Sequence, residues 1–441
     1  MRVVLALATL AGAVMVLHTA PCRDGAWWNG ESYANLCYSD VPLSYAAQGH
    51  AEGRVPYADT GGRYPPTNDT APVAALTWAS AELTRAASGS GELAGERSQL
   101  PVSRVGAQAS VQQEAATFAG VHDLLAVAAL LMVSGLLVGL SGRRPFDAAA
   151  FAVAPVTVLT ATIGWDLLAV ALSVGSLYAW ARRRAGLCAV LLGTAAAAMA
   201  WPVLLAVAAM PLAWRSGRTR QAGPVLAGAA LVWALWQVPV LLLVGPATWW
   251  GTVNTTAQGQ VGYGSLWRLL VLAGQVPDPA LVVSVTVAGV AAVVAAVIAL
   301  ALRARRAPRL PQLVLLLLLG TLVVWPTYSP QHVLWLLPFA VLARPRWRDL
   351  LIWQAAELLY FCAIWWTLSG ASVDSGSMDK PYVCAVVLRV VAQLWLGWTV
   401  VGDVLHPQRD PVRADLVSDD PAGGVLAEPV SAAPPGRMSW S

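Results

Sequence analysis

The sequence predicts an all-α polytopic membrane protein, and three observations carry that prediction. Of its 441 residues, 57% are hydrophobic and 12% are charged, whereas a soluble domain has about 25% charged residues. Uncharged runs such as LLAVAALLMVSGLLVGL and VVSVTVAGVAAVVAAVIALAL approach or exceed the roughly 18 apolar residues that cross a bilayer as a helix. The basic residues are nearly all arginines, and they cluster in short segments between the apolar runs.

These arginine clusters predict the orientation of the helices, because short cytoplasmic loops are enriched in Lys and Arg. The clusters occupy residues 143–144, 182–184, 215–220, 303–309 and 344–348. Only about 30 residues separate the second cluster from the third. The chain must therefore cross out and back, with an outer turn at Trp201–Pro202, where proline ends a helix. The same reasoning predicts helix breaks at IGWD and at YSPQH.

Together these arguments predict about twelve transmembrane helices with both termini in the cytoplasm. The expected spans are 3–20, 117–141, 147–163, 167–181, 186–200, 203–214, 222–244, 280–302, 310–326, 332–343, 349–369 and 382–404. Several are short, so tilt, a thinner bilayer or burial in protein must help them cross. A cleavable signal is the alternative for the first segment, but no clean small-x-small site follows it, so we expect a retained span.

The predicted loops between the spans differ greatly in length. Residues 1–404 form the predicted transmembrane domain, and residues 21–116 form its first extracytoplasmic loop, far longer than usual. Within that loop, APVAALTWASAEL is expected to lie along the membrane interface. Residues 405–441 are rich in Pro, Asp, Ala and Gly without periodicity, which predicts a disordered cytoplasmic tail. The polar interruptions GWD, AWP and YSPQH fall on the outer face, so the working surface is expected there.

Three polar features of that surface are candidate functional residues. Asp40, in CYSDVPLSYAAQGH, has the chemistry of a general base or metal ligand, although Ser39-Asp40 before a proline also resembles a helix N-cap. Arg63 and Tyr64, in GGRYPPT, present a guanidinium suited to phosphate or form an ordinary turn. Asp166 follows a helix break, and an N-cap explains it equally well.

A second group lies in WPTYSPQHVLW, which contains Tyr328, Gln331 and His332. Polar groups at membrane depth are costly unless they are paired or line a cavity. His332 is suited to binding phosphate, or it caps a helix. Glu357, inside the span 349–369, needs a polar partner for the same reason. The five histidines are scattered and indicate no metal site.

The cysteines add one open question about the outer loop. Cys22 and Cys37 are both external in this topology, in a compartment that permits disulfides. A bridge between them would close a loop of about 15 residues and rigidify the segment around Asp40.

Three segments carry a resemblance to a known family. They are YSDVPLSYAAQGHAEGRVPY with RYPPT, then GWDLLAVALSVGSLYAWARRRAGLCAVLLGTAAAAMAWPVLLA, and finally SPQHVLWLLPFAVLARPRWRDLLIWQAAELLYF. In this order they resemble actinobacterial membrane glycosyltransferases of the GT-C superfamily, specifically glycosyltransferase family 87. Members of that family are polyprenyl-phosphate-mannose-dependent mannosyltransferases, often α-(1→2). The three segments cover about a quarter of the chain.

The resemblance implies a GT-C type fold in an actinobacterial plasma membrane. It implies inverting transfer of a sugar, mannose in the family, from a polyprenyl-phosphate donor to a glycolipid or glycan of the cell envelope, on the extracytoplasmic face. Asp40 falls at the position of the family's base. By position, the residues expected at the donor phosphate are His332, Gln331, Arg63, Tyr64 and Arg268, with Asp166 and Tyr328 in supporting roles. No cofactor is required and nucleic acid is not an expected partner; a divalent metal occurs in some GT-C relatives but is not indicated here.

The chain also departs from the family pattern. Met199 stands where the family has a lysine before the AWP proline, Arg63 replaces a common acid, and Gly164 replaces a common Asn. These departures keep open a catalytically silent GT-C-fold membrane protein. A lipid-linked glycan flippase is the other alternative. Transporters, however, usually place polar sites at the midplane within internal repeats, and the polar breaks here face outward.

Overall fold

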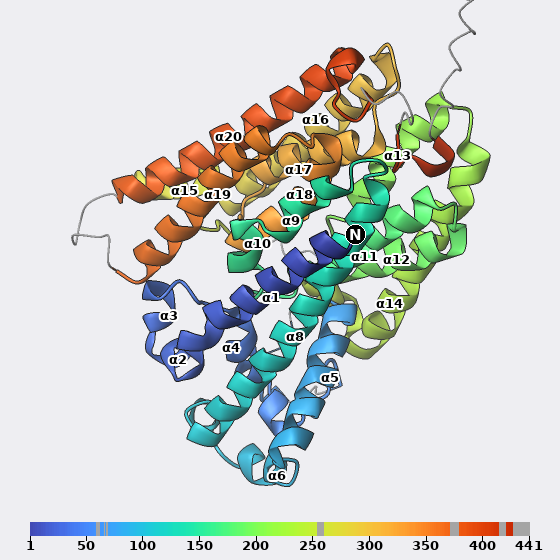
Figure 1. Cartoon of the computed structure of the whole chain (residues 1–441). Helices are drawn as coiled ribbons and strands as arrows, with labels where there is room; N and C mark the ends of the chain where they lie inside the picture. Colours follow the sequence, from blue (N-terminus) through green and yellow to red (C-terminus); the bar gives the residue numbers. More distant parts are fainter. Residues whose placement is uncertain are drawn as a thin grey trace, which may run out of the picture.

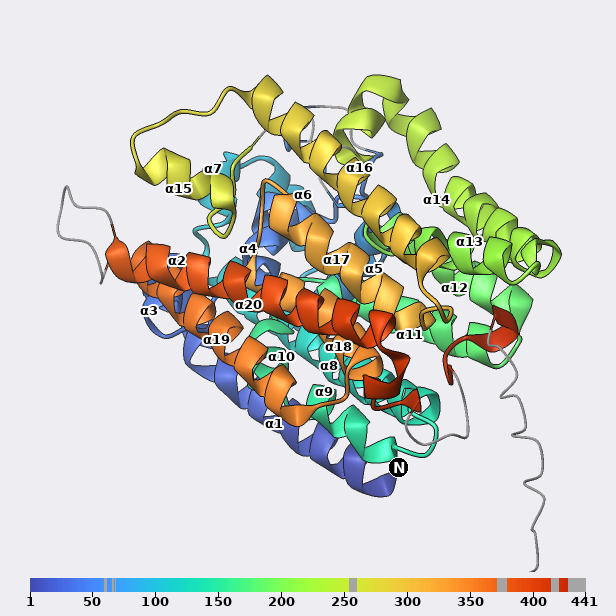
Figure 2. The same cartoon turned by 90° about the horizontal axis from the view of Figure 1, so that it is seen from above.

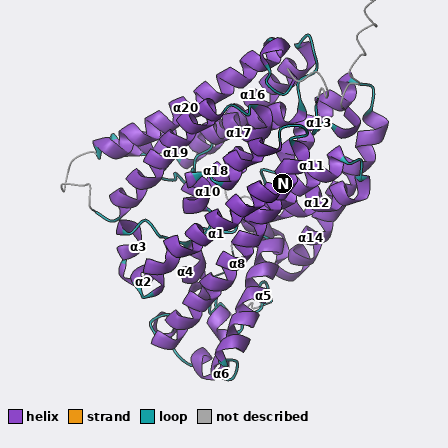
Figure 3. Ribbon diagram, in the orientation of Figure 1, coloured by secondary structure: helices purple, strands orange, loops and turns teal. Residues whose placement is uncertain are grey.

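The fold is that of a computed structural model, which describes residues 1–58, 62–65, 67, 69–253, 260–370, 379–413 and 420–426. Every regular element within these ranges is a helix, as Figure 3 shows. The helices pack around one large apolar core, and most of the long ones run side by side (Figures 1 and 2). The predicted all-α class is confirmed.

Six of the described helices are long and apolar enough to cross a membrane. They are α1 (Arg2–Arg23), α8 (Ala109–Leu140), α14 (Thr219–Val253), α16 (Pro279–Arg303), α19 (Trp347–Leu368) and α20 (Lys380–Leu405). Shorter apolar helices accompany them, namely α11 (Asp166–Ala181), α12 (Ala185–Ala198), α13 (Val203–Arg215), α17 (Leu310–Val324), and η4 (Pro330–His332) running into α18 (Val333–Ala343). This composition supports a protein that is embedded in a membrane through many helices.

The predicted helix breaks at AWP and YSPQH are confirmed. Met199 ends α12 in an extended conformation (φ −149°, ψ 152°), and Trp325 ends α17 in the same way (φ −66°, ψ 140°). In α14, Gly245 takes a left-handed conformation (φ 77°) that interrupts the helix where the predicted span 222–244 ends.

The predicted span 147–163 is wrong as a single helix. The segment instead forms η2 (Pro145–Ala148), α9 (Ala149–Ala152) and α10 (Pro155–Thr160). Pro155 lacks an N–H and disfavours helical geometry in the residue before it, and Ala154 is extended accordingly (φ −62°, ψ 125°). The resulting turns are largely buried in the core, so their backbone polar groups face protein rather than lipid.

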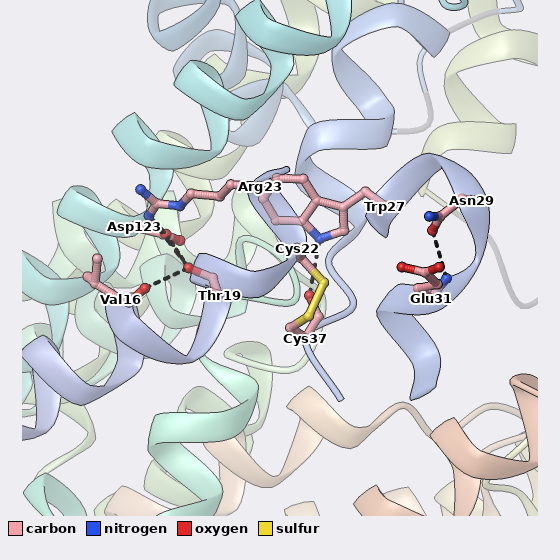
Figure 4. Close-up of a disulfide and its surroundings, with 9 residues drawn as sticks. All are labelled: Val16, Thr19, Cys22, Arg23, Trp27, Asn29, Glu31, Cys37 and Asp123. Carbon is pink, nitrogen blue, oxygen red and sulfur yellow. Dashed lines mark hydrogen bonds and ion pairs between the residues drawn. A yellow bond between two sulfur atoms is a disulfide. The ribbon is translucent and has the colours of Figure 1, made fainter. Parts of the chain in front are cut away.

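The first outer loop is folded into short helices. They are α2 (Ala26–Asn29), α3 (Glu31–Ala34), α4 (Asp40–Ala47), η1 (His50–Glu52), α5 (Ala71–Ser88), α6 (Leu93–Ser98) and α7 (Val102–Val105), the blue to cyan group at one end of the molecule in Figure 1. Cys22 and Cys37 form a disulfide, drawn in Figure 4. A buried pair, in which Arg97 donates to both carboxylate oxygens of Glu114 (2.9 and 2.6 Å), joins the loop to α8.

The predicted disorder from residue 405 onward is wrong for the described part of the tail. Residues 405–413, including η5 (Pro407–Arg409), and 420–426, including η7 (Gly424–Leu426), pack against the bundle (Figure 2). Asp410 is fully buried in an ion pair with Arg309, and Asp420 accepts the Leu310 N–H (2.8 Å). These two acids of the tail are thus paired with buried groups of the bundle. Residues 427–441 lie outside the described part.

Glu357 has the polar partners that its membrane depth requires. Its carboxylate accepts from Tyr328 Oη (2.8 Å), Trp353 Nε1 (3.0 Å) and Gln393 Nε2 (3.2 Å). The Arg389 guanidinium lies 3.6 Å from the centroid of the Tyr328 ring. This network ties α19 and α20 to the YSPQH break, which gives Tyr328 a supporting role.

Candidate functional site

Asp40 occupies the first position of α4, beside the IGWD break. Ser39 is the N-cap of this helix; its Oγ accepts the Val41 N–H (3.2 Å) and donates to the Thr162 carbonyl (2.7 Å). The Asp40 N–H donates to the Ile163 carbonyl (2.9 Å). Ser39 therefore supplies the cap that the sequence left open for Asp40, and the helix start is held against the 162–163 backbone.

Because Ser39 caps the helix, the Asp40 carboxylate is not needed as the cap. The residue is exposed, and Tyr38 Oη donates to its Oδ1 at 2.6 Å. The Tyr38 ring packs against Tyr33 and Trp365, whose ring centroids are both 4.9 Å away, and these two rings also contact each other (5.8 Å). Desolvation by the surrounding protein raises the pKa of Asp40, and the Tyr38 hydrogen bond opposes this rise. Its open surface limits the effect, because water still reaches the carboxylate.

The three predicted helix breaks meet beside this carboxylate. Trp335 Nε1 donates to Asp166 Oδ1 (2.8 Å), and the Trp335 ring lies against His332 and Trp201, with centroids 4.1 and 5.7 Å apart. Gly164 lies next to Asp166 and Gln331: a Cβ added at Gly164 would lie 3.2 Å from Asp166 Oδ2 and 3.9 Å from Gln331 Nε2. The GWD, AWP and YSPQH segments thus form one site.

Two buried polar atoms of this site have no hydrogen-bond partner among the described residues. They are Trp201 Nε1, a donor, and Gln331 Oε1, an acceptor. Buried polar groups are normally paired, so unpaired ones mark places where a ligand or water binds. His332 Nδ1 accepts the Ser329 N–H (3.2 Å). In the neutral ring Nε2 then carries the hydrogen and is a donor.

Asp69 is an acid at this site that the sequence analysis missed. Thr70 Oγ1 donates to the Ala198 carbonyl (2.7 Å) at the AWP break, and Gln48 Nε2 donates to Asp69 Oδ2 (3.1 Å). Burial raises the pKa of Asp69, and the negative charge of Asp40 adds to the rise. In the sequence, Asp69 lies in NDT, the pattern of an N-glycosylation sequon, which gives no sign of an acid at a functional site. Tyr38 and Trp335 were also missed, although each lies within three residues of a predicted site residue.

Gln48 also contacts a buried histidine, His50. His50 Nε2 lies 3.2 Å from Gln48 Oε1. Burial, followed by the charges of Arg54 and Arg85, lowers the pKa of His50 to about 4. His50 is therefore neutral near pH 7 and orients Gln48 rather than exchanging protons.

The structure does not place Arg63 and Tyr64 with the other predicted site residues. Arg63 donates through Nε and Nη2 to the Glu52 carboxylate (2.9 and 2.8 Å) and through Nη2 to the Leu100 carbonyl (2.7 Å). Tyr64 donates to the same carboxylate. These contacts stabilise the folded loop 21–116. They also pair the Arg63 guanidinium, which the resemblance placed at the donor phosphate, with Glu52 and the Leu100 carbonyl.

Arg268 lies at α15 (Leu266–Leu272), on a different segment. Its guanidinium lies 4.6 Å from the centroid of the Tyr263 ring, on a turn bonded through Gly264 N–H to the Tyr328 carbonyl (3.2 Å). No hydrogen bond or ion pair among the described residues joins its side chain to the Asp40 site. Among the described residues, no group of three or more His, Cys, Asp or Glu is arranged to hold a metal ion.

No protein-family model matches this chain, and no curated protein matches it either. The chemistry of the site therefore rests on its own residues. They combine an accessible carboxylate, held at a helix start, with a donor and an acceptor at helix breaks, Trp201 Nε1 and Gln331 Oε1, that have no partner among the described residues. Such a site can take a proton from a polar ligand and hold an anionic group beside it.

Proposed function

We propose that this protein is an integral membrane glycosyltransferase of the GT-C type. It moves a sugar, mannose by resemblance, from a polyprenyl-phosphate donor to a glycolipid or glycan on the extracytoplasmic face of an actinobacterial plasma membrane. The observation that carries the proposal is the position of Asp40. Its carboxylate is open, its backbone is bonded to the IGWD break, and that break meets the AWP and YSPQH breaks through Asp166 and Trp335.

Asp40 acts as the general base in this reaction. Its carboxylate takes the proton of the acceptor hydroxyl while that oxygen forms a bond to the anomeric carbon. The bond from the anomeric carbon to the phosphate oxygen breaks on the opposite face, and its electron pair leaves with the lipid phosphate. Attack from one face and departure from the other invert the anomeric centre. A raised pKa brings the carboxyl closer to the operating pH, which favours general-base catalysis.

The leaving phosphate needs hydrogen-bond donors or cations, because negative charge develops on it. The YSPQH and AWP breaks supply His332 Nε2–H and Trp201 Nε1–H, and Trp201 Nε1 is buried without a partner among the described residues. Met199, at the family's lysine position, ends α12 at the same break. In this proposal neutral donors replace the family's cation, and Arg63 does not compensate because Glu52 occupies it.

An assay that follows radiolabelled mannose from the donor to a glycolipid tests the proposed glycosyltransferase activity. Protein purified in nanodiscs is incubated with radiolabelled polyprenyl-phosphate mannose and a membrane glycolipid extract, and lipids are separated. We expect label in a glycolipid with wild type and with the control Arg348→Gln, whose side chain is 78% exposed. Failure with mannose and with a panel of other polyprenyl-phosphate sugars would contradict the proposal. Label that crosses a liposome bilayer without changing its chemical form would indicate a flippase.

The pH dependence of transfer tests the role of Asp40 through its neighbour. The Tyr38 hydrogen bond stabilises the Asp40 carboxylate and so lowers its pKa. In Tyr38→Phe this bond is lost, the pKa of Asp40 rises, and the base becomes protonated at a higher pH. The acid limb of kcat/KM should therefore move to higher pH, while the rate at alkaline pH stays near that of wild type.

Tyr178→Phe is the matched control, because it removes a tyrosine hydroxyl beside Arg182, at the opposite end of α11 from Asp166, and leaves the Tyr38–Asp40 bond intact. We expect its acid limb to coincide with that of wild type. An unchanged acid limb in Tyr38→Phe would show that the titrating base is not Asp40.

A further inference from the structure

A cavity of about 820 Å³ lies between the end of α1, the start of α2 and the first half of α8. Its volume falls in the range of small-molecule binding sites, about 300–1,000 Å³. The residues with polar side chains that line it are Arg23, Asp24, Trp28, Gln112, Gln113, Thr117 and Asp123. None of them belongs to the proposed Asp40 site.

Adjacent residues of α8 face the two sites. His122 Nε2 lies 3.0 Å from the carbonyl oxygen of Gly164 at the IGWD break. Asp123 instead lines the cavity and accepts from Arg23 Nη2 (2.7 Å) and Thr19 Oγ1 (2.9 Å), as Figure 4 shows. One helix therefore separates the cavity from the candidate catalytic site.

The charges of the lining disfavour an anionic ligand. Among the residues that line the cavity, the only guanidinium is that of Arg23, which is paired with Asp123, and Asp24 adds a second carboxylate. A phosphate there would be repelled by the second, uncompensated acid. Arg23 Nε is buried and has no hydrogen-bond partner among the described residues, so a donor remains for a neutral ligand.

The hydrogen-bonding groups match a ligand that carries hydroxyls. A hydroxyl both donates and accepts, and the cavity offers a donor in Arg23, acceptors in the acids, and both in Gln112 and Gln113. Gln113 is exposed and Gln112 is half-buried, so their amides are within reach of a ligand. The half-buried Trp28 adds an apolar surface with a polar N–H at its edge.

The rest of the lining is apolar and belongs to membrane helices. Val16 of α1 and Val121 and Leu124 of α8 line the cavity, and Leu124 is 70% exposed on the outside of the bundle. The polar end meets the outer loop at Asp24 and Trp28. A molecule that fits both ends has a hydroxyl-rich headgroup at the interface and a chain in the lipid.

We propose that this cavity binds the saccharide headgroup of a membrane glycolipid, at a site distinct from Asp40. The inference rests on the lining of the cavity and not on sugar transfer. It gives the protein a second surface that holds a glycolipid at the level of the outer membrane interface.

Gly120 supplies a variant that closes the cavity without disturbing the fold. It lines the cavity, and a Cβ added there meets no atom within 4 Å. Gly120→Phe should therefore fill the space from within α8. Gly402 is the matched control, because it is also half-buried within a long apolar helix with open space at its Cβ.

The probe is an alkyl mannobioside with a photoreactive diazirine on its alkyl chain. Wild type and Gly402→Phe in nanodiscs should be labelled on peptides that contain residues 16–28 and 112–124. Labelling of Gly120→Phe should fall at least about tenfold, equivalent to about 1.4 kcal/mol of binding free energy. Excess unlabelled alkyl mannobioside should compete, and phosphatidylglycerol of the same chain length should not.

Two results would overturn the inference. Undiminished labelling of folded, monodisperse Gly120→Phe would show that the cavity is not the site. Equal competition by phosphatidylglycerol would show an ordinary lipid contact without recognition of the saccharide. The labelling experiment measures cross-linking and does not depend on turnover. It can therefore be interpreted even if the transfer assay fails, and a negative labelling result does not bear on the proposed sugar transfer.

Discussion

Asp40→Asn is expected to lower the rate of sugar transfer by about 10²–10⁴-fold, the usual contribution of a general base. The amide is close to the carboxylate in size but cannot take the proton of the acceptor hydroxyl. The substitution leaves the local fold in place, because Ser39 caps α4 and the Asp40 backbone N–H bonds to Ile163. Tyr38 can still donate to the amide oxygen. Loss of rate in a well-folded variant therefore reports on chemistry.

The measurement compares initial rates of label transfer at equal folded yield. Asp278→Asn is the matched control, since Asp278 caps α16 through Ala280 N–H (2.9 Å) and Asn is an equally good N-cap. We expect the control to retain the wild-type rate. If Asp40→Asn also retained it, Asp40 would not be the base and the mechanism proposed here would fail.

Asp410→Ala is expected to lower the free energy of unfolding by about 3–5 kcal/mol, as removal of one partner of a buried ion pair does. Arg309 donates to the Asp410 carboxylate through Nε (2.7 Å) and Nη2 (3.0 Å), and Gln312 Nε2 adds a third bond (3.1 Å). The Arg309 and Asp410 side chains are 1% and 0% exposed. Without the carboxylate, the Arg309 charge stays buried, with the Leu342 and Ala343 carbonyls as its remaining acceptors.

Thermal unfolding in detergent, followed by limited proteolysis of the C-terminal segment, measures this loss. Arg409→Ala is the control, because Arg409 is the exposed neighbour of Asp410, and we expect it to unfold near the wild-type temperature. Arg309→Met combined with Asp410→Leu should recover much of the stability, since apolar residues of similar size often replace a buried pair without loss. An Asp410→Ala variant as stable as the control would contradict the described docking of the tail.

Local chemistry explains why some predictions succeeded. The bilayer requires long apolar helices, so composition alone indicated the class. Proline and the spacing of arginine clusters act within a few residues, and they located the breaks at Met199 and Trp325. The same local reasoning singled out Asp40, Asp166 and His332 as candidates, because charged or polar side chains beside apolar runs are costly without a partner; their roles stay predictions.

Contacts between distant residues explain where the predictions failed. Nothing near Arg63 in the chain shows that Glu52 and the Leu100 carbonyl occupy its guanidinium. The tail was predicted to be disordered because it is rich in Pro, Asp, Ala and Gly without periodicity. Nothing in that composition shows that Asp410 pairs with Arg309, 101 residues before it. Asp69 joined the site only through Gln48 and the AWP break.

By itself, the sequence determined an all-helical, membrane-embedded chain and the helix breaks at AWP and YSPQH. The outward placement of these breaks and the role of Asp40 as base stay predictions. The tertiary structure alone decided which of the polar residues meet, which arginines are already paired, and that a cavity lies between α1, α2 and α8. The physical reason is that hydrophobicity and backbone geometry act over a few neighbours. Pairing of buried charges instead depends on residues that only the folded chain brings within about 3 Å, the distance at which hydrogen bonds form.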